Sequence, residues 1–209
     1  QFFFDEGYIS SISKNFQGLM YRYQKLEELE KYKEIILWFD ACLFDQTMLL
    51  LILQQIKKLK VKTKISHILL SEHPEFESFH GLAQLSPEQI IKLYPSRQKL
   101  TETELELGAK AYDFYTSSSP TQLIQLIQNE DFQSVHPLAS KALQRHLKQY
   151  PSSFNGLSLT QHNLLEALIK GCKKPWEIFG YTQNREMPRF LGDTMFWPFI
   201  HELADCPRP

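Results

Sequence analysis

The spacing of hydrophobic residues in the first third of the chain predicts alternating helix and strand. From Phe16 to Tyr32, apolar side chains recur every three or four residues among Lys and Glu, which indicates an amphipathic helix. The continuous apolar run Ile35–Phe39 predicts a strand buried on both faces, as in parallel sheets. Helical spacing returns over Asp45–Lys58, and Lys64–Leu70 is a second strand candidate. This succession predicts one βαβ unit with parallel strands and a right-handed connection.

The middle of the chain carries signals for the starts of helices. A Ser or Thr followed three residues later by Gln or Glu can form a capping box, in which each side chain accepts a hydrogen bond from the other residue's backbone N–H group. Proline suits the first helical position because it lacks an N–H group. These signals predict helix starts at Ser86–Gln89, Thr101–Glu104, Ser119–Gln122 and Pro137, the last of these helices running through Gln149.

The last part of the chain is set off by Tyr150–Gly156, which has the Pro, Ser, Asn and Gly content of a linker. Beyond it, a capping box begins a helix at Ser158 that Gly171 ends, and two further helices are expected over Pro175–Phe179 and Asp193–Ala204. Three short helices joined by tight turns resemble a helix-turn-helix or winged-helix module.

These patterns predict an α/β protein with a Rossmann-like partial parallel sheet, a helix-rich middle and a C-terminal module of the helix-turn-helix or winged-helix type. We divide the chain into an α/β domain with a helical extension, residues 1–150, and a small helical domain, residues 151–209. The longest apolar stretch, Met48–Leu53, is far shorter than the roughly 20 residues of a membrane span, so no membrane association is expected.

Charge and cysteine content narrow the class of partner and the compartment. The 23 Lys and Arg nearly balance the 24 Asp and Glu, so electrostatic capture of nucleic acid or of an anionic membrane is not favoured. Residues 151–209 hold six basic and six acidic residues, and Trp176–Phe179, in the expected recognition helix, are apolar and acidic. DNA binding is therefore disfavoured and contact with a protein is preferred. Three widely spaced cysteines fit a reducing compartment, which predicts a cytoplasmic location.

The candidate ligand site follows from polar residues at the ends of the two strands. In open α/β sheets, ligands bind beyond the carboxyl ends of the strands. That rule selects Asp40, Asp45, Gln46, Glu72 and His73, which could bind a divalent cation or act as an acid and base pair. Three of them also have an ordinary structural interpretation. Asp45 would cap its helix, Asp40 would close the turn through backbone N–H groups, and His73 would be an exposed loop residue.

Three residues outside this group could also serve either a site or the structure. Arg97, just before a capped helix, could hold a phosphate or carboxylate through two hydrogen bonds, or be an ordinary solvated arginine. Cys42 is expected to be packed rather than reactive, and Asp193 is expected to cap the last helix. Neither a Gly-rich phosphate loop nor a motif of nucleophilic catalysis occurs in the sequence. The sequence therefore identifies no cofactor, no metal ligand set and no catalytic residue, and leaves open whether the protein is an enzyme.

Several short motifs follow one another over about residues 30 to 205, namely Leu37–Asp40 with Phe44–Gln46, Phe79–Leu82 with Leu85–Gln89, Arg97 with Thr101, His146 leading to Tyr150–Ser152, Asn155–Ser158, and Leu191–Asp193. In this order they resemble the family named domain of unknown function 1835, known from bacterial proteins, with its associated C-terminal helical domain. The resemblance implies an earlier strand with a Gly-Asp-Ser turn that would build part of the crevice, so this sequence is expected to be a fragment that begins after it. Where similar proteins carry an acidic pair before Phe-Asp-Gln, this chain has Asp40-Ala41-Cys42, which weakens a metal role.

Two functions follow as hypotheses. The first is a protein that binds a small molecule or nucleotide, with a site lined by Asp40, Asp45, Gln46, Glu72 and Arg97. The alternative is a regulatory or interaction protein whose C-terminal module contacts a protein or nucleic acid. Convergence of Asp40, Asp45 and Arg97 on one pocket would favour the first hypothesis, and engagement of their side chains in caps and salt bridges would remove its main support.

Overall fold

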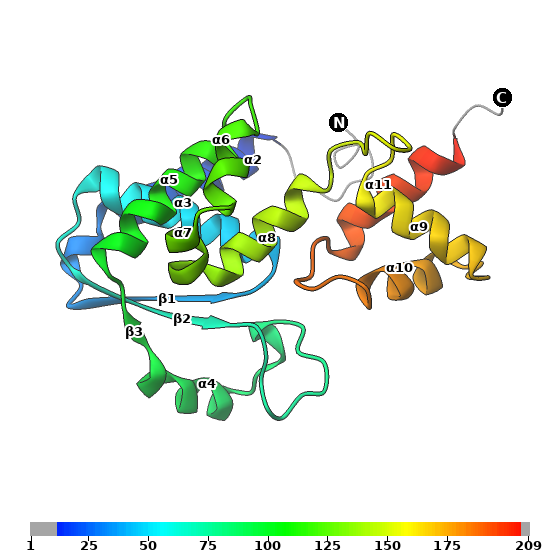
Figure 1. Cartoon of the computed structure of the whole chain (residues 1–209). Helices are drawn as coiled ribbons and strands as arrows, with labels where there is room; N and C mark the ends of the chain where they lie inside the picture. Colours follow the sequence, from blue (N-terminus) through cyan, green and yellow to red (C-terminus); the bar gives the residue numbers. More distant parts are fainter. Residues whose placement is uncertain (1–11, 206–209) are drawn as a thin grey trace.

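A computed structural model describes residues 12–205, with side chains from Phe16 onward, as a mixed α/β protein (Figure 1). Most of the described chain is helical, and three strands form one small mixed sheet. The helices of residues 43–59 and 102–147 lie together on one side of this sheet, the helix of residues 87–93 lies on the other side, and the C-terminal helices form a separate group beside them. None of the helices in residues 12–205 is long and apolar enough to cross a membrane.

The predicted βαβ unit is present. Strand β1 (Glu34–Asp40), helix α3 (Leu43–Leu59) and strand β2 (Lys64–Leu70) follow one another, and the two strands pair in parallel so that the last residue of each lies opposite the other. Helix α3 begins two residues before the predicted start. A third strand, β3 (Gln98–Lys99), pairs antiparallel with β2, and the order in the sheet is β1-β2-β3. Two polar residues carry no hydrophobic pattern, so the sequence did not predict β3.

The expectation that β1 is buried on both faces is wrong. Leu37 is the only buried residue of the strand. Ile35, Leu37 and Phe39 pack in one hydrophobic cluster with residues of α3, whereas Ile36 and Trp38, which alternate with them, belong to none of the buried clusters of the described residues. The physical reason is that α3 and the helices of residues 102–147 cover one face of the sheet, and β1 forms an edge of the sheet in the part of the chain that the structure describes.

The amphipathic helix predicted before β1 is confirmed as helix α2 (Ile12–Glu27). Its predicted last turn forms a separate 3-10 turn, Leu29–Lys31. Gln1–Ser11, including the Phe2–Phe4 run, lie outside the described residues.

The core lies between the sheet and a layer of helices. Besides α3, this layer contains α5 (Glu102–Tyr115), α6 (Thr121–Ile127), α7 (Glu130–Val135) and α8 (Pro137–Leu147). Helix α7 was not predicted. Its N-cap is Asn129, whose Oδ1 accepts a hydrogen bond from the N–H group of Phe132 at 2.9 Å. The fully buried Phe132 then fixes this short helix in the same cluster as α3 and α8.

Two of the three capping boxes predicted for the middle of the chain are confirmed. Ser86 and Gln89 cap α4 (Pro87–Leu93), and Thr101 and Glu104 cap α5. The box predicted at Ser119–Gln122 is wrong, because α6 begins at Thr121 and has Pro120 at its N-cap position. Gln122 is then the second helical residue rather than the third, so its side chain cannot close the box.

The C-terminal residues form three helices around a core of their own. Helices α9 (Leu159–Ile169), α10 (Pro175–Gln183) and α11 (Asp193–Ala204) pack around a cluster that includes Leu164, Ile178 and Phe196. Ser158 and Gln161 cap α9 as predicted, and α10 is longer than predicted. Asp193 does not cap α11, because Gly192 occupies the N-cap and Asp193 is the first helical residue. The described residues beyond 150 contain no strand.

Candidate functional site

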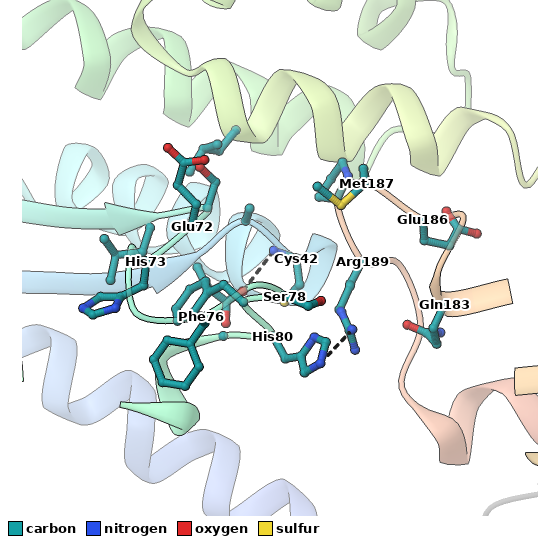
Figure 2. Close-up of a pocket in the computed structure, with 18 of the residues that line it drawn as sticks. Cys42, Glu72, His73, Phe76, Ser78, His80, Gln183, Glu186, Met187 and Arg189 are labelled. Carbon is teal, nitrogen blue, oxygen red and sulfur yellow. Dashed lines mark hydrogen bonds between the residues drawn. The ribbon is translucent and has the colours of Figure 1, made fainter. Parts of the chain in front are cut away.

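A crevice of about 720 Å³ opens where β1 and β2 end (Figure 2). Its walls are the last residues of both strands, the loop of residues 71–81, two residues of α8, and residues 183–189, which comprise the last residue of α10 and the segment after it. The crevice thus lies at the end of the sheet that the strand-end rule selected. The wall formed by residues 183–189 comes from the C-terminal group of helices, which that rule does not address.

The turn after β1 is closed by its own side chains. The N–H group of Cys42 donates to Asp40 Oδ1 at 2.9 Å, as expected for Asp40. The N–H group of Asp40 donates to Asp45 Oδ2 at 2.7 Å, and Gln46 Nε2 donates to the Asp40 carbonyl oxygen at 2.5 Å. The side chains of Asp45 and Gln46 therefore fix the backbone at the end of β1, and neither residue lines the crevice.

The expectation that Asp45 caps α3 is wrong. The N-cap is Cys42, whose Sγ accepts a hydrogen bond from the N–H group of Asp45 at 3.4 Å. Burial raises the pKa of the Cys42 thiol to about 12, and the nearby Asp40 carboxylate adds to this effect, so the thiol stays protonated at neutral pH. Burial also raises the pKa of Asp45, against the hydrogen bond from Asp40. Cys42 thus serves as a packed cap and lacks the thiolate character of a nucleophile.

Possible ligand atoms of Asp40, Cys42 and Asp45 lie within 4.8 Å of one another, which raises the question of a metal. Each residue already accepts a hydrogen bond from a backbone N–H group in this turn. A thiol whose pKa is raised to about 12 is also a poor metal ligand at neutral pH, because the thiolate is the form that binds. We therefore assign no metal to this cluster.

The other oxygen of Asp40 fits closely against Gly81. A Cβ atom at residue 81 would lie 2.4 Å from Asp40 Oδ2, and the φ angle of Gly81 is +130°, a conformation that side chains other than glycine rarely adopt. Glycine is thus required here on two counts. This close approach fixes the backbone next to His80, which lines the crevice. The N–H group of His80 also donates a hydrogen bond to Gln84 Oε1.

His73 was expected to be an exposed loop residue, and this is wrong, because it is only 8% exposed. Its ring packs edge-on against Phe76, with ring centroids 5.5 Å apart, and lies 6.3 Å from the ring of Phe79. Its Nδ1 accepts a hydrogen bond from the N–H group of Glu75 at 3.3 Å. The two phenylalanines of the same loop are the sequence signal that could have indicated this burial.

The remaining two predicted site residues lie far apart. Glu72 is exposed and lines the crevice together with Asp40. Arg97 instead contacts Glu34, with Arg97 Nε 3.2 Å from Glu34 Oε1, and its guanidinium stacks 4.2 Å from the centre of the Tyr94 ring. Glu34 begins β1 and Asp40 ends it, about 20 Å further along at ~3.3 Å per residue. Of the five predicted ligand residues, the structure brings only Asp40 and Glu72 to the crevice.

Arg189 lines the crevice and was not predicted as a site residue. Its Nη2 lies 3.2 Å from Nε2 of His80, and its carbonyl oxygen accepts a hydrogen bond from the N–H group of Leu43 at 3.4 Å. Among the residues that the structure describes, no carboxylate lies within ion-pair distance of its guanidinium. Arg189 and His80 are 109 positions apart in the sequence, so no local pattern relates them.

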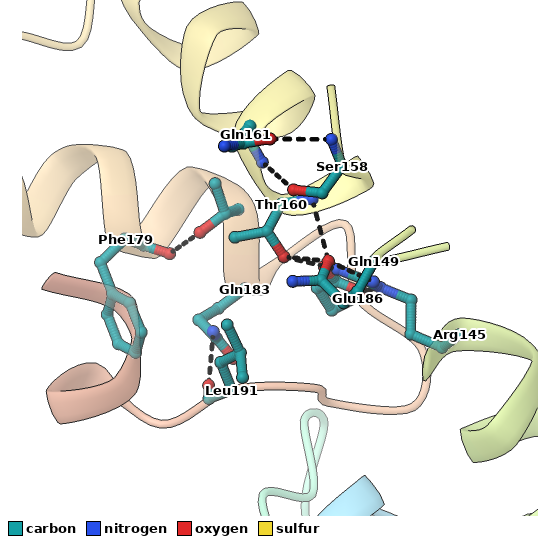
Figure 3. A network of polar contacts seen from close by, with 10 residues as sticks. Arg145, Gln149, Ser158, Thr160, Gln161, Phe179, Gln183, Glu186 and Leu191 are labelled. Carbon is teal, nitrogen blue, oxygen red and sulfur yellow. Dashed lines mark hydrogen bonds and ion pairs between the residues drawn. The ribbon is translucent and has the colours of Figure 1, made fainter. Parts of the chain in front are cut away.

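A buried network holds the segment before Arg189 in place (Figure 3). Arg145 of α8 forms two hydrogen bonds to the carboxylate of Glu186, and the two side chains are each 7% exposed. Arg145 also donates to Thr160 Oγ1 at 3.0 Å and stacks 3.9 Å from the centre of the Phe190 ring. This network ties α8 to the start of α9 and to the crevice wall beyond α10.

No protein-family model, no curated protein and no solved structure matches the chain in comparisons with known proteins. The resemblance to domain of unknown function 1835 therefore stays a prediction. The crevice and the residues that line it are the features of the described chain that bear on function.

Proposed function

We propose that the protein binds a small molecule or nucleotide in the crevice at the ends of β1 and β2, and that the βαβ unit acts as the ligand-binding part of a Rossmann-like domain. The observation that carries the proposal is the crevice itself. Its volume of about 720 Å³ lies within the roughly 300–1,000 Å³ of ordinary small-molecule sites. It also joins carboxylates from the strand ends, Asp40 and Glu72, to basic groups from other elements, Lys141 and Arg189.

The arrangement supports binding better than it supports any one reaction. Asp40 is held in a closed turn, Cys42 is protonated at neutral pH, and Asp45 faces the strand end. The chain also lacks a Gly-rich phosphate loop, so a nucleotide would be held by side chains and by the ends of elements. We also propose that the chain divides into two domains between residues 150 and 151, that the protein is cytoplasmic, and that it is related to domain of unknown function 1835.

Filling the crevice tests the proposal. Ser78 is exposed and lines the crevice, so Ser78→Trp should occupy its volume without removing any described hydrogen bond. Thermal-shift assays of the parent protein against nucleotides and small metabolites should identify compounds that raise Tm, since a ligand that binds only the folded state stabilises it. Ser78→Trp should abolish those shifts, whereas Ser153→Trp, at an exposed position outside the crevice, should keep them. Equal responses of the two variants would contradict the proposal.

A second candidate function is contact with a protein through the C-terminal helices. Ile169, at the end of α9, is 84% exposed, and Trp176, in the first turn of α10, is 64% exposed. Exposed large apolar side chains on one helical group favour a protein partner over DNA. Sedimentation velocity of the full chain tests self-association as the simplest case, with Trp176→Ser against the parent. A concentration-dependent complex that the substitution removes would support this candidate, and monomers throughout would contradict the self-association form of it.

A further inference from the structure

We propose that Arg189 is the anion-binding residue of the crevice, and that the ligand bears a phosphate or carboxylate group which binds this guanidinium. The inference rests on the proposed function, because it assigns a chemical class to the ligand of the same crevice. Three observations support it. The guanidinium of Arg189 has no carboxylate partner among the described residues, hydrogen bonds fix its backbone, and the buried acidic groups nearby already have partners.

The contacts of Arg189 differ from those of the other arginines near the C-terminal helices and the sheet. Arg97, Arg145 and Arg185 each contact a carboxylate, that of Glu34, Glu186 and Glu166, respectively. Arg189 has no such partner among the described residues, although it is partly buried and burial lowers its pKa. A guanidinium has five N–H donors in a planar fork that matches an oxyanion. An anion in the crevice would supply the charge that the protein does not.

His80 leaves most of those donors available. Arginine can only donate, so His80 Nε2 is the acceptor of the hydrogen bond between the two side chains. One ring nitrogen occupies one N–H direction of the fork. Figure 2 shows the Arg189 side chain directed towards His80 within the crevice. The pair therefore orients the guanidinium without neutralising it.

The backbone of Arg189 is held before any ligand arrives. The N–H group of Leu43, at the start of α3, donates to its carbonyl oxygen, and Glu186, three residues earlier, is fixed by Arg145. Gln183 Nε2 donates to the carbonyl oxygen of Leu191 at 2.9 Å, which closes the segment from the other side. A site held in place in advance loses less conformational entropy on binding.

The acidic groups of the crevice do not compete for Arg189. Glu186 is already paired with Arg145, and Asp40 accepts a backbone hydrogen bond while its other oxygen rests against Gly81. Glu72 and Glu77 are exposed and lie beyond ion-pair distance of its guanidinium. A ligand oxyanion would therefore find the guanidinium unpaired.

The test follows the Arg189 side chain directly. The ¹⁵Nε–Hε NMR signal of Arg189, identified by its loss in Arg189→Gln, is followed during titration with inorganic phosphate, glycerol 3-phosphate, glycerate and glycerol at constant ionic strength. The two phosphates and the carboxylate distinguish the two sources of the anion, and glycerol is the neutral control. Binding isotherms are measured in parallel for the parent, Arg189→Gln and Arg185→Gln, the last of which removes an exposed arginine outside the crevice.

We expect a saturable shift of the Arg189 signal with a phosphate or with glycerate and none with glycerol. Arg189→Gln should weaken that binding about tenfold or more, as the loss of a charge-assisted hydrogen bond predicts, and Arg185→Gln should leave it unchanged. An unmoved Arg189 signal, or equal weakening by Arg185→Gln, would overturn the inference. If Ser78→Trp abolishes the rise in Tm caused by the compounds from the thermal-shift assay and Arg189→Gln leaves it unchanged, this inference fails and the proposed function stands. If Ser78→Trp changes no binding at all, both fail.

Discussion

The carboxylate of Glu186 meets the guanidinium of Arg145 in a buried ion pair with two hydrogen bonds, and this pair joins α8 to the segment that carries Arg189. Its geometry satisfies both charges where water has little access. The pair lies between two groups of helices that each have their own hydrophobic cluster. Its integrity therefore bears on both the stability of the chain and the shape of the crevice.

Breaking this pair should be strongly destabilising. Glu186→Gln leaves the Arg145 guanidinium buried without a counter-charge, so we expect a loss of about 3–5 kcal/mol in the free energy of unfolding. Glu166→Gln removes an acid paired with Arg185 in a more exposed setting and should cost about 1 kcal/mol or less. Urea unfolding followed by circular dichroism measures both. Similar losses in the two variants would show that the Arg145–Glu186 pair has no special role.

Gly81 should not tolerate a side chain. Gly81→Ala places a Cβ atom against Asp40 Oδ2 and forces alanine into a positive φ, so we expect a loss of about 1–3 kcal/mol from the backbone strain and a further loss from the clash. Gly180→Ala is the matched control, since nothing lies within 4 Å of its Cβ position and it stands inside α10. There alanine should stabilise the chain by up to about 1 kcal/mol. Thermal unfolding gives both values, and an unchanged Tm for Gly81→Ala would contradict the close contact with Asp40.

The amino end of β1 should make stability sensitive to acid. Hydrogen bonds from Lys64 first, then Ser66 and Arg97, lower the pKa of Glu34 to about 2. A depressed carboxyl pKa contributes stability that is present above its unfolded value, about 4.3, and is lost as pH falls towards 2. Glu34→Gln should therefore flatten the acid limb of a stability curve measured between about pH 5 and pH 2. An acid limb as steep in Glu34→Gln as in the parent would contradict this role of Glu34.

Local patterns predicted the elements whose signals lie within a few residues. The capping box of Ser86 and Gln89 was identified because both partners stand in one helical turn, and the βαβ unit because its hydrophobic runs are long. Asp45 was assigned the wrong role because α3 begins earlier than predicted and its cap is a cysteine, a weak acceptor that standard capping patterns omit.

Long-range relationships set the rest of the site. Arg97 was placed at the crevice because β3, which follows it directly, was not foreseen; that strand turns back along β2 and leaves Arg97 beside Glu34. Arg189 and His80 are 109 positions apart in the sequence. Their contact depends on how the C-terminal helices pack against the α/β part. The strand-end rule could identify one wall of the crevice but had no information about the opposite wall.

The thiol of Cys42 should resist alkylation in the folded protein. Its pKa of about 12 leaves far less thiolate at neutral pH than the ordinary cysteine value of about 8.5 would, and the thiolate is the reactive form. We expect iodoacetamide to modify Cys42 at least about a hundredfold more slowly in the native chain than in urea, with the modified peptide quantified by mass spectrometry. Cys42→Ser tests the capping role separately, because serine is a better N-cap and should preserve or raise the free energy of unfolding, whereas Cys42→Ala should lower it. Rapid native alkylation of Cys42 would contradict the raised pKa, and equal stability of the two variants would contradict the cap.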